Sequence, residues 1–88
     1  MIIGKTESGF EFEIPEENLD DWELIETLAD IDAGNAEAIV KIPKMLLGAE
    51  QANDLKEHLR GNNGRISATA MTKVITEILK STKKLKNS

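Results

Sequence analysis

A run of carboxylates is the first place in this sequence where chemistry could occur. Five acidic residues lie close together: Glu16, Glu17, Asp20, Asp21 and Glu23. They could bind a hard cation or form an acid/base pair, but a cation site needs ligands that converge on one point, usually with a glycine-bearing loop. These residues instead line the start and the outer face of a predicted helix. We therefore predict a solvated acidic surface there and no metal site.

The other chemically versatile residues lack the partners that catalysis requires. His58 is the single histidine and the chain has no cysteine, so the sequence supports neither a zinc site nor a nucleophile relay. The glycines lack the spacing of a phosphate-binding loop and the Lys-Ser/Thr pair that follows it. We predict a non-catalytic protein without a cofactor, in which His58 is a half-exposed helix residue near Asp54.

The elements that position these residues begin with a strand. Residues 9–14 alternate strictly between apolar and polar. One face of the strand would therefore hold three apolar side chains: Phe10, Phe12 and Ile14. Ile2 and Ile3 lie upstream of a turn-forming stretch, residues 6–9, which predicts a short N-terminal β-hairpin. Pro15 ends the strand.

Helical periodicity follows the hairpin. We expect helices at about 21–32, 36–47, 49–60 and 68–82, with Ser67 as the N-cap of the last one. Asp20 and Glu23 form a predicted capping box for the first helix, and Asn35 a predicted cap for the second. Pro43 should kink or restart the second helix, and Gly48 should end it. The predicted fold class is mainly α (α+β): a short hairpin followed by about four packed helices.

Two of these helices carry wide apolar surfaces. The first has two adjacent rows, Trp22, Ile25 and Ala29 in one and Leu24, Leu28 and Ile31 in the other. The last has the widest stripe in the chain: Met71, Val74, Ile75, Ile78 and Leu79. The simplest interpretation of that stripe is core, and it is also our candidate partner-binding surface. We predict one domain, residues 1–82, and a flexible basic tail, residues 83–88.

Charge is divided along the chain. Residues 1–40 hold twelve acidic residues and one basic residue, a net charge of −11, whereas residues 41–88 hold four acidic and ten basic residues, a net charge of +6, which together give −5. This division predicts weak head-to-tail self-association.

A DNA-binding regulator that uses residues 49–82 in a helix-turn-helix arrangement is the alternative function. The net negative charge of the whole chain disfavours nucleic-acid binding. So does the absence of aromatic residues after Trp22, since bases would have no side chains on which to stack.

The sequence also predicts the cellular location of the protein. Without cysteine there is no disulfide framework, so the cytosol is the expected location. The N-terminal residues lack the pattern of a signal peptide. No apolar run exceeds three residues, so we expect no membrane partner.

The run from Ser8 to Leu24, which joins the alternating strand to the start of the first predicted helix, resembles the tail assembly chaperones of long-tailed phages and prophages that infect Gram-positive bacteria. The resemblance covers about residues 8–80 and is clearest in the run from Ser8 to Leu24, with its strand and its Asp20-Asp21-Trp22-Glu23 motif. Three shorter matches follow: Leu46-Leu47-Gly48-Ala49-Glu50-Gln51, Leu55-Lys56-Glu57-His58-Leu59-Arg60 and Gly64-Arg65-Ile66.

The resemblance implies a small helical protein that binds the tape measure protein and helps tail tube subunits polymerise around it. It implies action in the cytoplasm of the bacterial host cell during phage assembly, and absence from the mature virion. In such families a ribosomal frameshift near the end of the reading frame often yields a longer second product. A tape measure protein is long and helical with apolar stripes, and we expect the stripe on residues 68–82 to contribute to that contact.

Overall fold

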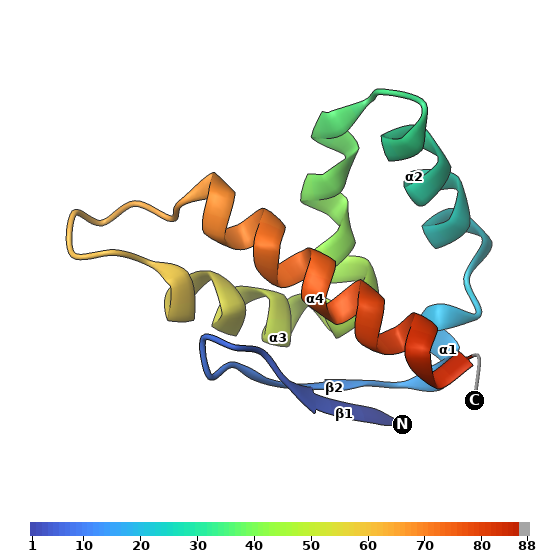
Figure 1. Ribbon diagram of the computed structural model, residues 1–88, viewed down its shortest axis with the longest axis horizontal. Helices are drawn as coiled ribbons and strands as arrows, with labels where there is room; N and C mark the ends of the chain where they lie inside the picture. The colour runs from blue at the N-terminus through green and yellow to red at the C-terminus, as the bar shows by residue number, and fades with distance from the viewer. Residues whose placement is uncertain (87–88) are drawn as a thin grey trace.

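The computed structural model describes the backbone of residues 1–86 and the side chains of residues 1–82. Its elements are, in order, β1 (Ile2–Lys5), β2 (Glu11–Ile14), α1 (Glu16–Leu19), α2 (Trp22–Asp32), the 3₁₀-helix η1 (Ala36–Lys41), α3 (Ile42–Leu59) and α4 (Ala68–Lys86). Figure 1 shows the hairpin of β1 and β2 beneath α4 and the second half of α3, while α2 and η1 rise to one side. The predicted fold class, mainly helical with an N-terminal hairpin, is confirmed.

The hairpin forms as its alternating pattern predicts. β1 and β2 are antiparallel, and the Thr6 N–H donates to the Phe10 carbonyl at 2.9 Å to close the turn. The three apolar residues predicted to share a face are all buried: Phe10, Phe12 and Ile14. Glu11 and Glu13 lie on the opposite, exposed face, so the strand has one apolar and one acidic side.

Gly4 leaves the space that the Phe12 ring occupies. The two residues are cross-strand neighbours in the hairpin. A Cβ atom on Gly4 would lie 2.5 Å from the nearest ring carbon of Phe12, closer than two carbon atoms can approach. The close approach of β1 to this ring therefore depends on the missing side chain.

The start of α2 differs from the prediction. Residues Glu16–Leu19 form a helical turn of their own, α1, and the Asp20 N–H donates to the Glu16 carbonyl at the end of that turn. Asp20 is therefore not the N-cap of α2, and the predicted capping box is wrong. Asp21 takes that position with an extended backbone, and its carboxylate accepts a hydrogen bond from the Glu23 N–H at 2.9 Å.

The segment before α3 restarts at Pro43, as predicted. The Ile42 N–H donates to the Ile39 carbonyl in a 3₁₀ bond, and Pro43 has no N–H with which to continue an α-helical ladder to that carbonyl. The predicted cap at Asn35 is wrong because its side chain makes no capping bond. Its backbone N–H instead donates to the Asp30 carbonyl and ends α2.

Gly48 divides α3 into two helical parts. Its backbone angles are φ 83° and ψ 164°, a conformation that residues with a side chain rarely adopt. The break predicted at this glycine is confirmed. It turns the chain so that the second part of α3 runs beside the hairpin and α4 (Figure 1).

A turn joins α3 to α4. The Gly61 N–H donates to the Arg65 carbonyl at 2.8 Å, and residues Arg60 and Ile66 form a single β-bridge. Ser67 caps α4 as predicted, since its hydroxyl accepts from the Ala70 N–H at 3.2 Å. The two helices then run antiparallel over the hairpin (Figure 1).

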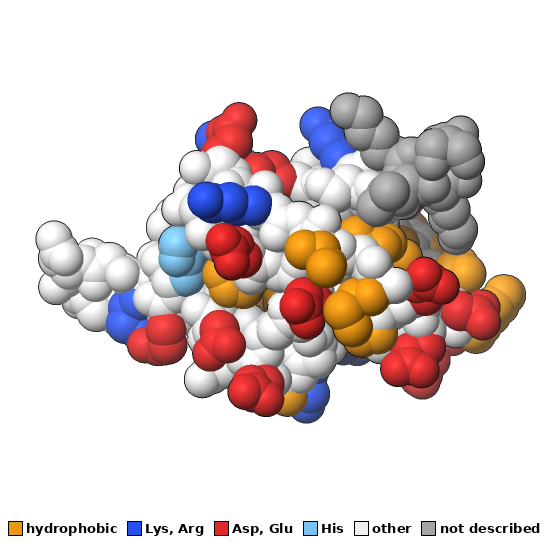
Figure 2. All heavy atoms as spheres, turned by 90° about the horizontal axis from the view of Figure 1, so that it is seen from below, with side chains coloured by type: hydrophobic (Ala, Val, Ile, Leu, Met, Phe, Trp, Pro, Cys, Tyr) orange, Lys and Arg blue, Asp and Glu red, His pale blue; other side chains and the backbone are white. Residues whose placement is uncertain are grey.

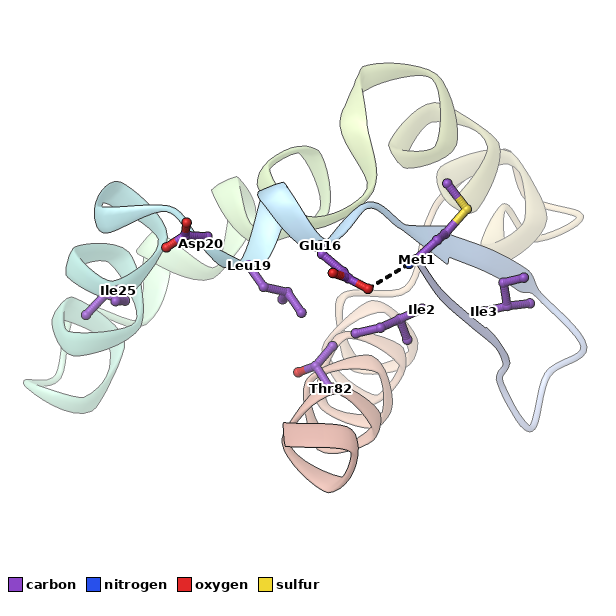
Figure 3. A pocket seen from close by; sticks show the side chains of 8 residues that line it. All are labelled: Met1, Ile2, Ile3, Glu16, Leu19, Asp20, Ile25 and Thr82. Carbon is purple, nitrogen blue, oxygen red and sulfur yellow. Dashed lines mark hydrogen bonds and ion pairs between the residues drawn. The ribbon is translucent and has the colours of Figure 1, made fainter. Parts of the chain in front are cut away.

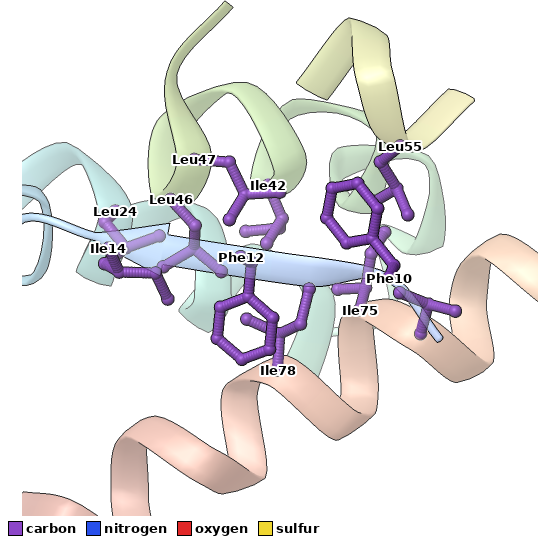
Figure 4. Close-up of a cluster of buried hydrophobic side chains, with 11 residues drawn as sticks. Phe10, Phe12, Ile14, Leu24, Ile42, Leu46, Leu47, Leu55, Ile75 and Ile78 are labelled. Carbon is purple, nitrogen blue, oxygen red and sulfur yellow. The ribbon is translucent and has the colours of Figure 1, made fainter. Parts of the chain in front are cut away.

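The core lies where β2, α3 and α4 meet. Figure 4 shows apolar side chains from the strand between those of the two helices. The members with the least exposure are Ile14, Ile42, Leu46, Leu55 and Ile78. Because no aromatic residue follows Trp22 in the chain, aliphatic side chains from the helices fill the space around the two phenylalanines.

The end of the chain extends the last helix beyond its predicted limit. Residues 83–86 of the predicted tail belong to α4, so the domain boundary at residue 82 falls inside a helix. Residues 87–88 of that tail lie outside the described residues. In the part of the chain that the structure describes, no helix combines the length and the apolar character needed to cross a bilayer.

Candidate functional site

The predicted partner-binding stripe faces inward. Val74, Ile75 and Ile78 are between 1% and 3% exposed and belong to the core. Met71 and Leu79 are partly buried at its edges. A protein partner could reach the three central residues only if α4 separated from the hairpin and α3. The structure therefore directs the search for a binding site to other surfaces.

The carboxylates of α1 and α2 serve different purposes. Asp21 caps α2, and Glu16 accepts a hydrogen bond from the N-terminal amino group of Met1 at 3.0 Å. Within residues 1–82, no group of three or more histidine and acidic side chains is placed to hold a metal ion. The acidic run is an exposed surface of negative charge.

His58 has a different partner from the one predicted. Its Nε2 atom lies 3.1 Å from the Ser8 carbonyl and 3.2 Å from the Ser8 hydroxyl. Its ring packs against Phe10, with 5.6 Å between the ring centroids. His58 therefore links the hairpin turn to α3.

Large apolar side chains are exposed on α2 and β1. In α2 the row of Leu24 faces the core, whereas Trp22 and Ile25 in the adjacent row are 72% and 52% exposed. Ile3 of β1 is 73% exposed. A single exposed apolar residue is ordinary, whereas a group of them makes this region a candidate contact surface.

Ile3 and Ile25 line the same cleft. The cleft has a volume of about 660 Å³ and lies between β1, α1, α2 and the last described turns of α4. Its lining is made by Met1, Ile2, Ile3, Glu16, Leu19, Asp20, Ile25 and Thr82. In Figure 3, Leu19 points from α1 into the space between α2 and α4, with Ile25 on one side and Ile2 and Thr82 on the other.

Acidic side chains surround this apolar surface. Glu16 and Asp20 belong to the lining. Ile3 stands opposite Glu13 in the hairpin register, on the exposed face of the strands. Figure 2 shows the apolar side chains gathered on one half of this face, with acidic side chains among and around them. The cleft thus combines apolar contact with negative potential.

Basic residues of the second half are partly engaged with acids. Arg60 forms an ion pair with Glu57 at 2.7 Å. This pairing raises the pKa of Arg60 and lowers the pKa of Glu57, mainly through the side-chain hydrogen bonds between them. Lys73 lies 3.5 Å from the Glu7 carboxylate. Two basic side chains of residues 49–82, the segment of the DNA-binding alternative, therefore contact acidic side chains.

Sequence reasoning missed the cleft because its parts are distant in the chain. Residues from the hairpin, from α1 and α2, and from the far end of α4 come together only in the folded structure. The one signal in the sequence was the second apolar row of α2, which gave that helix more apolar surface than a single packing face needs.

Comparison of the chain with protein-family models, with curated proteins and with solved structures finds no match.

Proposed function

We propose that this protein is a non-catalytic tail assembly chaperone of a phage or prophage. It binds the tape measure protein and promotes polymerisation of tail tube subunits around it in the cytoplasm of the bacterial host, and it leaves before the virion is complete. Two things support the proposal. One is the sequence resemblance over the hairpin and the first helices, and the other is an exposed apolar surface on a small helical domain.

The observation that carries the proposal is the exposure of Trp22 and Ile25 on α2. Burying a large apolar side chain in a complex contributes about 1.5–3 kcal/mol. A long helical partner with apolar stripes would aggregate when its stripes face water, so contact with this surface would protect it. A contact with the stripe of α4 would additionally require that helix to leave the core.

Co-expression with the tape measure protein of the same phage tests the proposal. We expect the wild-type chain to keep that partner in the soluble fraction and to co-purify with it. The double variant Trp22→Ser, Ile25→Ser should lose both effects while keeping its helical circular dichroism. Val40→Ser is the matched control, because Val40 is 75% exposed but lies in η1, away from the row of Trp22 and Ile25 on α2 and outside the lining of the cleft.

The rival function, DNA binding by residues 49–82, is an outcome of the same experiment. Recovery of nucleic acid in place of the tape measure and tail tube proteins would replace the chaperone proposal. A regulator would also show an affinity for duplex DNA that falls steeply as salt increases. The pairing of Arg60 with Glu57 and of Lys73 with Glu7 reduces the number of cations available for phosphates.

A further inference from the structure

The cleft between β1, α1, α2 and α4 has a distinct combination of surfaces. Its apolar walls come from Ile2, Ile3, Leu19 and Ile25, and Trp22 lies one helical turn before Ile25 on the same row of α2. Ile3, Ile25 and Trp22 are each more than half exposed. A ligand in this cleft would therefore cover apolar surface that the fold leaves open to water.

The charge around the cleft favours a positively charged ligand. Residues 16–26 supply Glu16, Leu19, Asp20 and Ile25 to the lining and contain six acidic residues and no lysine or arginine. Complementary charge across an interface steers association and selects partners. Two copies of this chain that paired through the same surface would set these acids against each other, so a symmetric dimer through the cleft is disfavoured.

The side chains of the lining suit a helical ligand better than an extended one, which would have to use the open backbone edge of β1. An extended segment needs hydrogen-bond donors for its backbone carbonyl groups, whereas a helix satisfies its own. The Thr82 hydroxyl already donates to the Leu79 carbonyl at 2.7 Å, and the N-terminal amino group of Met1 is paired with Glu16. The other lining side chains are aliphatic groups, a thioether and ionised carboxylates, so none of them is a hydrogen-bond donor.

We infer that this cleft binds an amphipathic helix whose large aliphatic residues are flanked by lysine or arginine. The aliphatic residues pack against Leu19, Ile25 and Trp22, and the basic residues pair with the acids of α1 and α2. The inference deepens the proposed function and rests on it for the role of the cleft as a partner site. It names the class of segment in the partner that the cleft recognises.

Two synthetic peptides test this inference with the full chain. The first has about 18 residues, roughly five helical turns, with leucine on one face and lysine on the other. In the second, glutamate replaces every lysine. Trp22 is the single tryptophan, is exposed and lies on the row of Ile25 just outside the lining, so its fluorescence reports a helix that extends from the cleft along α2. We expect the lysine peptide to shift the emission to shorter wavelength and to gain helical circular dichroism, and the glutamate peptide to do neither.

Variants locate the contact. Ile25→Ser should weaken binding of the lysine peptide about tenfold. Val40→Ser is the control for apolar exposure outside the cleft, and we expect it to bind like wild type. Asp20→Asn should also weaken binding and reduce its dependence on salt, whereas Glu37→Gln, an exposed acid outside the lining, should not. Isothermal titration calorimetry measures each affinity without relying on Trp22.

Several results would overturn the inference: equal binding of both peptides, equal effects of Ile25→Ser and Val40→Ser, or a bound lysine peptide that stays unfolded. A shift to dimer mass in sedimentation that Ile25→Ser abolishes would assign the cleft to a second copy instead. If the lysine peptide does not bind but the tape measure protein still co-purifies, this inference alone is overturned. Peptide binding without that co-purification would overturn the chaperone proposal alone.

Discussion

The side chain of Gln51 in α3 hydrogen-bonds to the backbone of Glu13 at the outer edge of the hairpin. Its amide nitrogen donates to the Glu13 carbonyl at 2.7 Å, and its amide oxygen accepts from the Glu13 N–H at 2.8 Å. One side chain therefore occupies both hydrogen-bonding positions that a third strand would use at this residue. The same amide nitrogen donates to the Leu47 carbonyl at 2.9 Å beside the Gly48 break.

Replacing Gln51 by alanine should lower the free energy of unfolding by about 1 kcal/mol, because water can replace part of these exposed bonds. Urea denaturation followed by circular dichroism measures the change. Glu50→Ala, at the preceding and exposed position of α3, is the control. Equal midpoints for the two variants would show that the amide contributes nothing to the attachment of the strand.

Gly4→Ala should destabilise the protein by about 1–3 kcal/mol, because the new methyl group overlaps the Phe12 ring. The effect should shrink when Phe12→Leu removes the ring, so a double-mutant cycle isolates the overlap. Thermal unfolding of the four proteins provides the measurement. Additive effects of the two substitutions would contradict the steric explanation.

Ile78→Val should cost about 0.5–1.5 kcal/mol, the loss of one methylene group from the core. Thr76→Ala, on the exposed side of α4, should change stability much less. The larger double change Val74→Glu, Ile78→Glu should unfold the chain, as monitored by far-UV circular dichroism. A folded double variant that had lost partner binding would instead support the stripe as a contact surface.

The pair of Glu57 and Arg60 gives stability a specific pH dependence. Because Arg60 lowers the pKa of Glu57 in the folded state, the pair stabilises the fold above the unfolded-state pKa, and this contribution is lost as pH falls below about 4.5 through the folded-state pKa. Urea midpoints measured from pH 6 to pH 3 should fall less in Glu57→Gln than in the wild type. If the urea midpoints of the two proteins fall equally with pH, the pair of Glu57 and Arg60 does not contribute to the pH dependence of stability.

The unequal charge of the two halves predicts weak head-to-tail self-association at low ionic strength. Sedimentation velocity should show an average mass that rises with protein concentration in low salt and returns to the monomer value in high salt. A constant mass across both conditions would contradict the prediction.

Local patterns in the sequence were sufficient for the parts of the fold that local physics determines. The alternation around Phe12 specified a buried strand face, Gly48 marked a break that needs positive φ, and Ser67 marked a helix start. Capping was less predictable, since Asp20 and Asp21 are equivalent candidates until the turn of α1 engages one of them.

The candidate site depended on tertiary contacts that a local pattern does not contain. The rows of Leu24 and Trp22 on α2 are similarly apolar, and only the packing of α2 against η1 and α3 decides which one is buried. The bonds of Gln51 and His58 to the hairpin join residues far apart in the chain, so helical periodicity gave no sign of them.

Binding of a ligand in the cleft depends on the folding of the whole domain. A two-stranded hairpin is at best marginally stable alone, and here it holds its shape by packing on the helices. The cleft, whose walls come from β1, α1, α2 and α4, therefore exists only while the whole domain is folded. A partner at a hundred times its dissociation constant would raise the free energy of unfolding by about 2.7 kcal/mol. A ligand bound in the cleft would thus also protect this chain from unfolding.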